Sequence, residues 1–446
     1  MKTSTIIVSG GIVRRIPVWL IPMVYVVASA IAGLVLPRIE SAYFPEYVHD
    51  MSVGSATAFF SSVSSGMMAL TGIVFAIAFV AVQFSALAYS PRVVVMFASD
   101  PMLFHALGIF FATFTYSLAA LIWTDRSGSG TVPLFSTVVV LCLVIVSMVA
   151  FAALVRNLNN LQIHHVLKVT GDRGRATIRG MFARIPDGTG APQHAAADPT
   201  PDLGPATQTL TYSGEPRVIA RLDIPTLVRL AEAANATLVI DCGVGETLVE
   251  DTVLMHVHGA SQAIPEASLM RAVHLANART FEQDPKYAIR LLVDIAIKAL
   301  SPAINDPTTA VQALDQIEDL LRRLGRRELD AGRAFDASGT LRLTFPVPTW
   351  GDYLALSFDE IRLYGGSSVQ VIRRLRAVLV GLADSLAVEE RRIEVQRYLD
   401  HLNLGIGRSL FDDLDQAAAL QEDRQGLGLS RKRPTLRSPR REPVQV

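Results

Sequence analysis

The chain has 446 residues, of which 50% are hydrophobic and 18% are charged, whereas soluble domains average about 25% charged residues. Its formal net charge is zero, which gives no case for nucleic acid or for a strongly acidic substrate as a partner. The cysteines Cys142 and Cys242 form neither a CxxC pair nor a zinc-binding spacing, so no metal or other cofactor is expected. Charged residues are scarce before Arg156 and dense after it. This asymmetry indicates that the two parts of the chain lie in different solvents.

Apolar runs in the first 156 residues predict a transmembrane domain. The run between Arg15 and Arg38 carries no charge and is long enough, at 1.5 Å per residue, to cross a hydrocarbon core of about 30 Å. A cleaved signal peptide is the alternative for this run, because Ala28-Ser29-Ala30 resembles a cleavage site. The apolar residues continue past it to Pro37, which favours a span. We therefore predict an α-helical bundle of about four transmembrane helices at residues 16–37, 64–89, 102–124 and 132–155.

The second apolar run is longer than one span needs. No Asp, Glu, Lys, Arg or His occurs from Met51 to Pro91, a length of about 60 Å as one helix. Two structures fit residues 51–63: an extension of the same helix, or an interfacial or re-entrant segment that leads into the span. The sequence leaves both open.

Basic residues predict the orientation of the spans. Lys2, Arg14 and Arg15 precede the first span, and Arg156 and Lys168 follow the fourth. With an even number of spans, we expect both termini in the cytoplasm of a bacterium, with the chain crossing the inner (plasma) membrane.

Small and polar residues gather on one face of the second span. Ser61, Ser65, Met68 and Gly72 follow an i, i+4, i+7, i+11 spacing, and Phe75 continues the same face. One interpretation is a helix that lines a pore, with Met68 and Phe75 as an apolar constriction. The other is close packing, because small residues let helix backbones approach each other. Four spans enclose a pore poorly, so the pore interpretation requires a homo-oligomer.

The residues after the spans predict a cytoplasmic α+β region. We expect a juxtamembrane helical connector at 157–184, a flexible linker at 185–215, a small β-rich module at 216–262 and a helical module at 263–412. A basic, disordered tail is expected at 413–446. Near a cytoplasmic leaflet each basic residue of such a tail contributes about 1 kcal/mol of attraction to anionic lipid headgroups.

Two places in this region are candidate sites. His256 and His258 share one face of an expected strand and are weak candidates for metal binding. Without a third ligand at a recognisable spacing, ordinary histidines explain them better. Asn305-Asp306-Pro307 predicts a corner between two helices, with Asp306 as the N-cap and Pro307 in the first turn. A ligand or interface role for the corner is a further hypothesis.

The whole chain resembles a bacterial family of predicted integral membrane proteins that carry domain of unknown function 2254. The resemblance lies in Thr71 to Gln83, Ser90-Pro91-Arg92, Gly243 to Val249, Arg279-Thr280 with Asp284, and Ala299 to Ala310. Ala303 stands where the family often has glycine, which argues against a strict requirement for positive φ there. The resemblance implies the architecture and no activity. It adds Arg279 and Asp284 to Asn305 and Asp306 as candidate ligand or interface residues.

Three classes of function remain open. A homo-oligomeric ion channel with a cytoplasmic regulatory region is the first hypothesis, because a plain anchor needs no polar helix face. A membrane-anchored sensor or scaffold, whose soluble region binds a ligand or a partner protein, is the second. An enzyme is the third and is not expected, because the sequence contains no GxSxG, Walker or HExxH motif.

Overall fold

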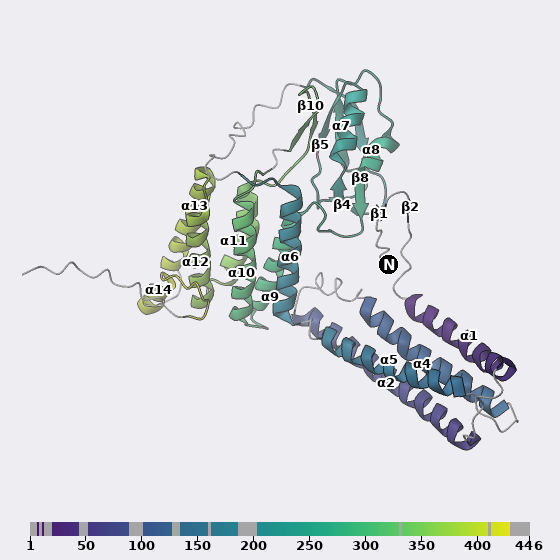
Figure 1. Ribbon diagram of the computed structural model, residues 1–446. Coiled ribbons are helices and arrows are strands. Elements are labelled where there is room, and N and C mark those ends of the chain that lie inside the picture. Colours follow the sequence, from purple (N-terminus) through teal and green to yellow (C-terminus); the bar gives the residue numbers. More distant parts are fainter. Residues whose placement is uncertain are drawn as a thin grey trace, which may run out of the picture. The chain divides into compact units, whose positions relative to one another are not determined.

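The computed structural model describes residues 7–8, 11–12, 20–43, 52–88, 101–126, 134–158, 162–185, 203–329, 332–408 and 412–428. The chain divides into two compact units, one up to His165 and one from Val166 onward. Four apolar helices form most of the first unit, and helices with small sheets form the second (Figure 1). The predicted fold class, a membrane helix bundle followed by an α+β region, is confirmed.

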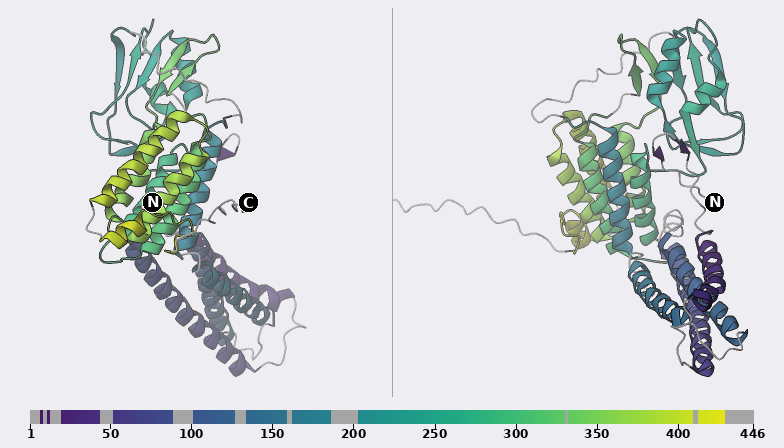
Figure 2. Two further views of the ribbon diagram at one scale, coloured as in Figure 1. Left: turned by 90° about the vertical axis from the view of Figure 1, so that its left-hand side faces the viewer. Right: turned by 45° about the vertical axis from the view of Figure 1, so that its right-hand side comes forward.

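The first unit contains α1 (Leu20–Tyr43), α2 (Val53–Ala88), α4 (Pro101–Arg126) and α5 (Leu134–Leu158). Each is long and apolar enough to cross a membrane. The four run side by side, and α4 contacts the other three (Figure 2). Many of their large apolar side chains, such as Met148 and Phe79, are exposed in the single chain. Apolar exposure of this kind is what a hydrocarbon solvent requires.

Helix α2 resolves the question that the sequence left open at residues 51–63. It is one continuous helix of 36 residues that starts at Val53, so 53–63 extend the second span as helix. Ala56, Phe60 and Val74 lie on its buried face and pack in two apolar clusters with α4 and α5. At 1.5 Å per residue the helix is about 54 Å long, more than a bilayer core needs. Two short strands, β1 (Ile7–Val8) and β2 (Gly11–Ile12), pair before α1.

Seven helices of the second unit form a helical module: α6 (Ile163–Met181), α9 (Pro285–Ala299), α10 (Pro307–Leu324), α11 (Trp350–Tyr364), α12 (Val369–Ser385), α13 (Glu389–Gly407) and α14 (Asp413–Ala419). Capping fixes where several of them begin. Thr349 and Asp352 form a capping box at α11, and the Ser368 hydroxyl accepts a hydrogen bond from Val371 N at α12. The apolar faces meet in a core that includes Leu292 and Leu314.

Two small sheets form a sheet module at one end of these helices (Figure 1). The first has the order β3 (Ala206–Thr211), β7 (Val253–His258), β5 (Thr237–Ile240), β10 (Leu341–Thr344) and β9 (Arg333–Phe335), with only β5–β10 parallel among its described pairs. The second has the order β6 (Thr247–Leu248), β4 (Arg217–Leu222) and β8 (Val273–Ala276). Helices α7 (Ile224–Ala233) and α8 (Glu266–Ala272) pack with them around one apolar core.

The structure differs from the predicted boundaries in three places. Residues 206–211, expected in the linker, form β3, because Leu210 joins the core and the strand pairs with β7. Strands β8 and β10, inside the expected helical module, pair with β4 and β5 far back in the sequence, and β9 joins the sheet by pairing with β10. Residues 413–428, expected in the tail, form α14 and a turn in which the buried Asp423 carboxylate accepts hydrogen bonds from Gly426 N and Gly428 N. Residues 186–202 and 429–446 lie outside the described residues.

A glycine allows α6 to pack closely on two other helices. A Cβ atom added at Gly174 would lie 2.8 Å from Ala288 Cβ of α9 and 3.0 Å from Leu320 Cδ1 of α10. Arg175 on the same helix bonds Asp319 of α10, with 2.8 Å between Nη1 and Oδ2. The close approach therefore orients α6 against α9 and α10.

We expect Gly174→Ala to lower the free energy of unfolding by about 1–3 kcal/mol, because the added methyl group overpacks this contact. Gly180 is the matched control on the same helix, since a Cβ there meets nothing within 4 Å. Gly180→Ala should leave stability unchanged or raise it by up to about 1 kcal/mol through helix propensity. Thermal unfolding midpoints measure both, and equal effects of the two substitutions would contradict the packing account.

Candidate functional site

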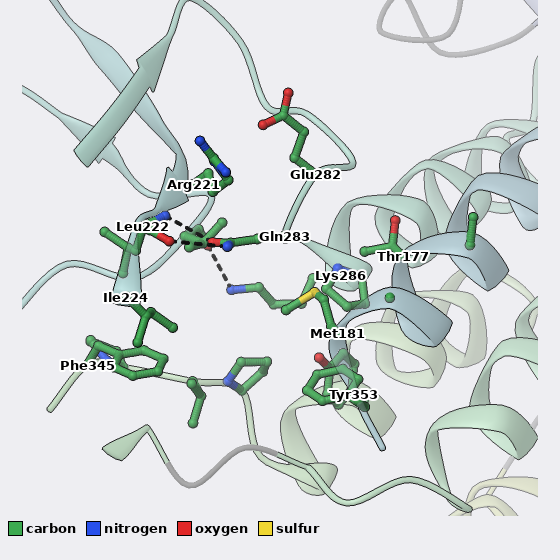
Figure 3. Close-up of a pocket in the computed structure, with 18 residues that line it drawn as sticks. Thr177, Met181, Arg221, Leu222, Ile224, Glu282, Gln283, Lys286, Phe345 and Tyr353 are labelled. Carbon is green, nitrogen blue, oxygen red and sulfur yellow. Dashed lines mark hydrogen bonds between the residues drawn. The ribbon is translucent and has the colours of Figure 1, made fainter. Parts of the chain in front are cut away.

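A cavity of about 590 Å³ lies inside the second unit, where the sheet module meets the helices. The end of α6, the end of β4, the first residue of α7, the turn at Val244, residues 282–286 at the start of α9, and residues 345–348 with the start of α11 line it (Figure 3). Most of the lining is apolar and includes Met181, Ile224, Val244, Phe345 and Val347. A concave, mostly apolar space with a few polar groups is typical of a small-molecule site.

Few polar groups line the cavity, and each has a defined position. Lys286 extends across the space and its Nζ donates to Val244 O at 3.3 Å (Figure 3). Gln283 is fixed by two hydrogen bonds to the backbone of Leu222, of 2.9 and 3.2 Å. The hydroxyl of Tyr353 is fully buried and has no hydrogen-bond partner among the described residues. Burial raises the pKa of this phenol, and the nearby Asp284 carboxylate raises it further.

Asp284 is the most unusual residue near this cavity. It occupies the N-cap position of α9, its side chain is only 2% exposed, and neither carboxylate oxygen has a hydrogen-bond partner in the described part of the chain. Gly245 packs directly on it: a Cβ there would lie 2.5 Å from Asp284 Oδ2 and 3.6 Å from Arg279 Cζ. Gly245 also has φ of +90°, a conformation that glycine adopts without strain.

Burial controls the ionisation of Asp284. Desolvation raises the pKa of its carboxyl, and the cations Lys286 and Arg279 together with the peptide N–H groups of Tyr287 and Lys286 only partly oppose this. The net result is a raised pKa. An unpartnered buried carboxylate destabilises a fold, and groups of this kind concentrate at functional sites. A neutral carboxylic acid here is, in addition, a hydrogen-bond donor.

The structure brings together only part of the predicted ligand or interface set. Arg279 and Asp284 meet at Gly245, whereas Asn305 and Asp306 follow the other end of α9, whose 15 residues span about 22 Å. Asp306 caps α10 by accepting from Thr309 N at 3.1 Å. Asn305 has φ of +49°, a left-handed conformation that asparagine tolerates. Both residues therefore have a structural role in the corner.

The five predicted pore-lining residues lie on one face of α2, as their spacing predicts. Ser61, Ser65, Met68, Gly72 and Phe75 are all exposed in the single chain, Met68 at 52% and Phe75 at 62%. A Cβ at Gly72 would meet nothing within 4 Å. Each of these residues directly follows a buried one, such as Phe60 or Val74, so this face lies beside the side of α2 that packs on α4 and α5, and the described helices of one chain leave it exposed.

The two histidines of β7 have ordinary partners. His256 lies 3.2 Å from Asp241 (Nε2 to Oδ2) and 3.1 Å from Thr209 (Nδ1 to Oγ1), and His258 Nδ1 lies 3.0 Å from Gly204 O. Within the described ranges, no group of three or more His, Cys, Asp or Glu side chains is placed to hold a metal ion. The pair therefore gains no third ligand from the fold.

We expect Asp284→Asn to raise the stability of the folded protein, and the gain to depend on pH. Because the folded-state pKa is raised, the wild-type protein loses stability as pH rises from the ordinary Asp value of about 3.9 through the folded-state pKa. The amide does not ionise, so its advantage should grow over that window to about 1–3 kcal/mol. Unfolding midpoints of the wild type and the variant, measured from about pH 4 upward to about pH 9, test this.

Asp319→Asn is the control with the opposite sign. Burial raises the pKa of Asp319, but hydrogen bonds from Arg323 and Arg175 outweigh it, and the pKa is lowered. The wild-type protein therefore gains stability as pH rises through this group, and the substitution should destabilise it most at neutral pH. If both substitutions changed the pH dependence of stability in the same direction, the conclusion that Asp284 is buried without a hydrogen-bond partner would be wrong.

Comparison with known proteins places this arrangement in a family. A family model described as "Predicted membrane protein (DUF2254)" matches residues 15–380, which include the four apolar helices, Gly245 and Asp284. Uncharacterised proteins of Mycobacterium bovis and Mycobacterium tuberculosis are 26% identical over 416 residues, which cover 90% of this chain and 78% of each relative. No solved structure matches the chain. The chain therefore belongs to the DUF2254 family of predicted membrane proteins.

Proposed function

We propose that this membrane protein is a membrane-anchored sensor whose second unit binds a small amphipathic molecule with an acidic group. The observation that carries the proposal is the cavity of about 590 Å³ beside two buried polar side chains, Asp284 and Tyr353, for which the described residues provide no hydrogen bond of good geometry. Unsatisfied buried groups of this kind are expected where a ligand completes them. A binding role needs no catalytic motif, and we propose no enzymatic activity.

The lining favours an acidic group on the ligand. The Lys286 ammonium has three donors and one described acceptor, Val244 O. Arg221 adds a second cation on the lining, with Nη2 2.9 Å from His274 Nε2. Glu282 is the one acidic residue among the lining residues. An apolar body would lie against Met181, Ile224 and Phe345, with its acidic group at Lys286.

We also propose that both termini and the cavity lie on the cytoplasmic side of the inner membrane. The support is the excess of basic residues before the first span and after the fourth. A ligand from the cytoplasm would then reach the cavity directly.

The test is a thermal-shift screen of small aromatic and acyl carboxylates and phosphates, with the full chain in lipid discs. A true ligand at about 100 times its Kd should stabilise the fold by about 2.7 kcal/mol. Lys286→Met should abolish the shift by removing the cation, and Ile224→Trp should abolish it by filling the cavity.

Lys168→Met on the exposed surface of α6 is the matched control and should keep the full shift. A compound that stabilised Lys286→Met and Ile224→Trp as much as the wild type would bind elsewhere. A screen without any hit would move the assignment to the second candidate function.

A homo-oligomeric ion channel lined by α2 is that second candidate. The supporting observation is the exposed face of Ser61, Ser65 and Gly72, because hydroxyl groups on a helix in a membrane are best satisfied by water or by another helix. Another copy of the chain would be needed to complete the pore.

We expect ion flux from liposomes to change in the Ser65→Trp/Gly72→Trp variant, because both substitutions place a bulky side chain on the proposed pore face. Ile73→Trp is the control, since Ile73 is 57% exposed on a different face of α2. Equal flux in the wild type and both variants, or a strictly monomeric protein in discs, would exclude the pore.

A further inference from the structure

One end of the helical module carries large apolar side chains that no described residue of the second unit covers. At this end α6 begins, α9 ends, α11 ends and α14 lies, while the sheet module occupies the opposite end (Figures 1 and 2). We define the end surface by its exposed apolar residues, which come from helix ends and turns: Ile304, Leu363, Tyr364, Leu414, Leu420 and Leu427.

The exposure of these side chains is large. Leu414 is 81% exposed, Leu427 69% and Leu363 67%. Their positions on helix ends and turns rather than on one helix face mean that they do not form the seam of a helix bundle. Soluble surfaces scatter apolar residues singly, whereas six large exposed ones at the same end of a module favour an interaction site there.

We propose that the end surface binds the surface of a lipid bilayer that contains anionic lipid. Chain connectivity supports a bilayer as the partner. The first residue of α6, Ile163, follows the last residue of the apolar helix α5, Leu158, by five positions. The end of the module that carries the exposed leucines is therefore the end through which the chain enters from a membrane-spanning helix.

Charge supports the same partner. Directly after Leu427 the sequence continues with basic residues and a single acid: Arg431, Lys432, Arg433, Arg437, Arg440, Arg441 and Glu442. Apolar side chains next to a basic segment are the combination that binds anionic membrane surfaces. These basic residues lie outside the described residues, so the argument uses their sequence alone.

Acidic residues at the same end limit what charge can do. Three exposed acids lie beside Leu414 at the start of α14: Asp412, Asp413 and Asp415. They oppose attraction to anionic lipid at this point. Insertion of Leu414, Leu420 and Leu427 into the interface must therefore contribute to binding together with the basic segment.

Fluorescence quenching in lipid discs tests the proposal with the full chain. Cys142 and Cys242 are first replaced by alanine, because they are the free cysteines of the chain. An environment-sensitive fluorophore is then attached to Leu414→Cys, to Leu427→Cys or to the control Phe335→Cys, which lies on β9 of the sheet module and is 55% exposed. The discs contain phosphatidylcholine and phosphatidylglycerol with nitroxide-labelled acyl chains.

The proposal predicts several-fold stronger quenching at positions 414 and 427 than at 335, in discs that hold one chain each. Omitting phosphatidylglycerol should weaken the quenching at 427 more than at 414, because position 427 adjoins the basic segment. Equal, weak quenching at all three positions would overturn the proposal. A fluorophore at position 414 that is shielded from water only in discs with two or more chains would also overturn the proposal. That result would identify a second copy of the chain as the partner.

Discussion

The constraint around which the candidate site is arranged is the burial of the Asp284 carboxyl at the junction of the sheet module and the helices. Three requirements meet there. Asp284 is the N-cap residue of α9. Gly245 must lack a side chain, because a Cβ there would clash with the Asp284 carboxyl. Tyr353 of α11 lies near enough for the same carboxyl to raise the pKa of its phenol. Neither oxygen has a hydrogen bond of good geometry from a described donor, although the peptide N–H groups of Lys286 and Tyr287 lie near enough to oppose the rise in the pKa of the carboxyl. The fold therefore keeps a poorly satisfied carboxyl next to a cavity. An N-cap side chain that accepted a hydrogen bond from the first turn would stabilise α9 more.

The two candidate functions use different parts of the chain and are compatible. The cavity lies wholly in the second unit, and the uncovered face of α2 lies wholly in the first. A ligand bound in the second unit can change α2 only if the protein has two conformations and the ligand binds one of them more tightly than the other. The sensor proposal therefore stands without a channel, whereas a regulated channel would require both.

Local signals predicted local structure well. The charge-free runs gave the four apolar helices, and Asp306 with Pro307 predicted the start of α10, because burial and capping depend on neighbouring residues. Strand partners were not predictable: β3 was assigned to a linker because its pairing with β7 is decided by residues far along the chain. The cavity was missed for the same reason. Asp284 was selected only through the family resemblance, since a sequence does not record whether a carboxylate is buried without a partner.

The most direct test of the account is the protonation of the Asp284 carboxyl itself. Infrared difference spectra of the full chain against Asp284→Asn, recorded during a pH titration, isolate the carbonyl band of this one group. We predict a protonated carboxyl that persists above the ordinary Asp pKa of about 3.9 and a band typical of a weakly hydrogen-bonded acid. A carboxylate that titrates at or below that value would mean that Asp284 is satisfied in solution, and the case for a ligand site beside it would fail.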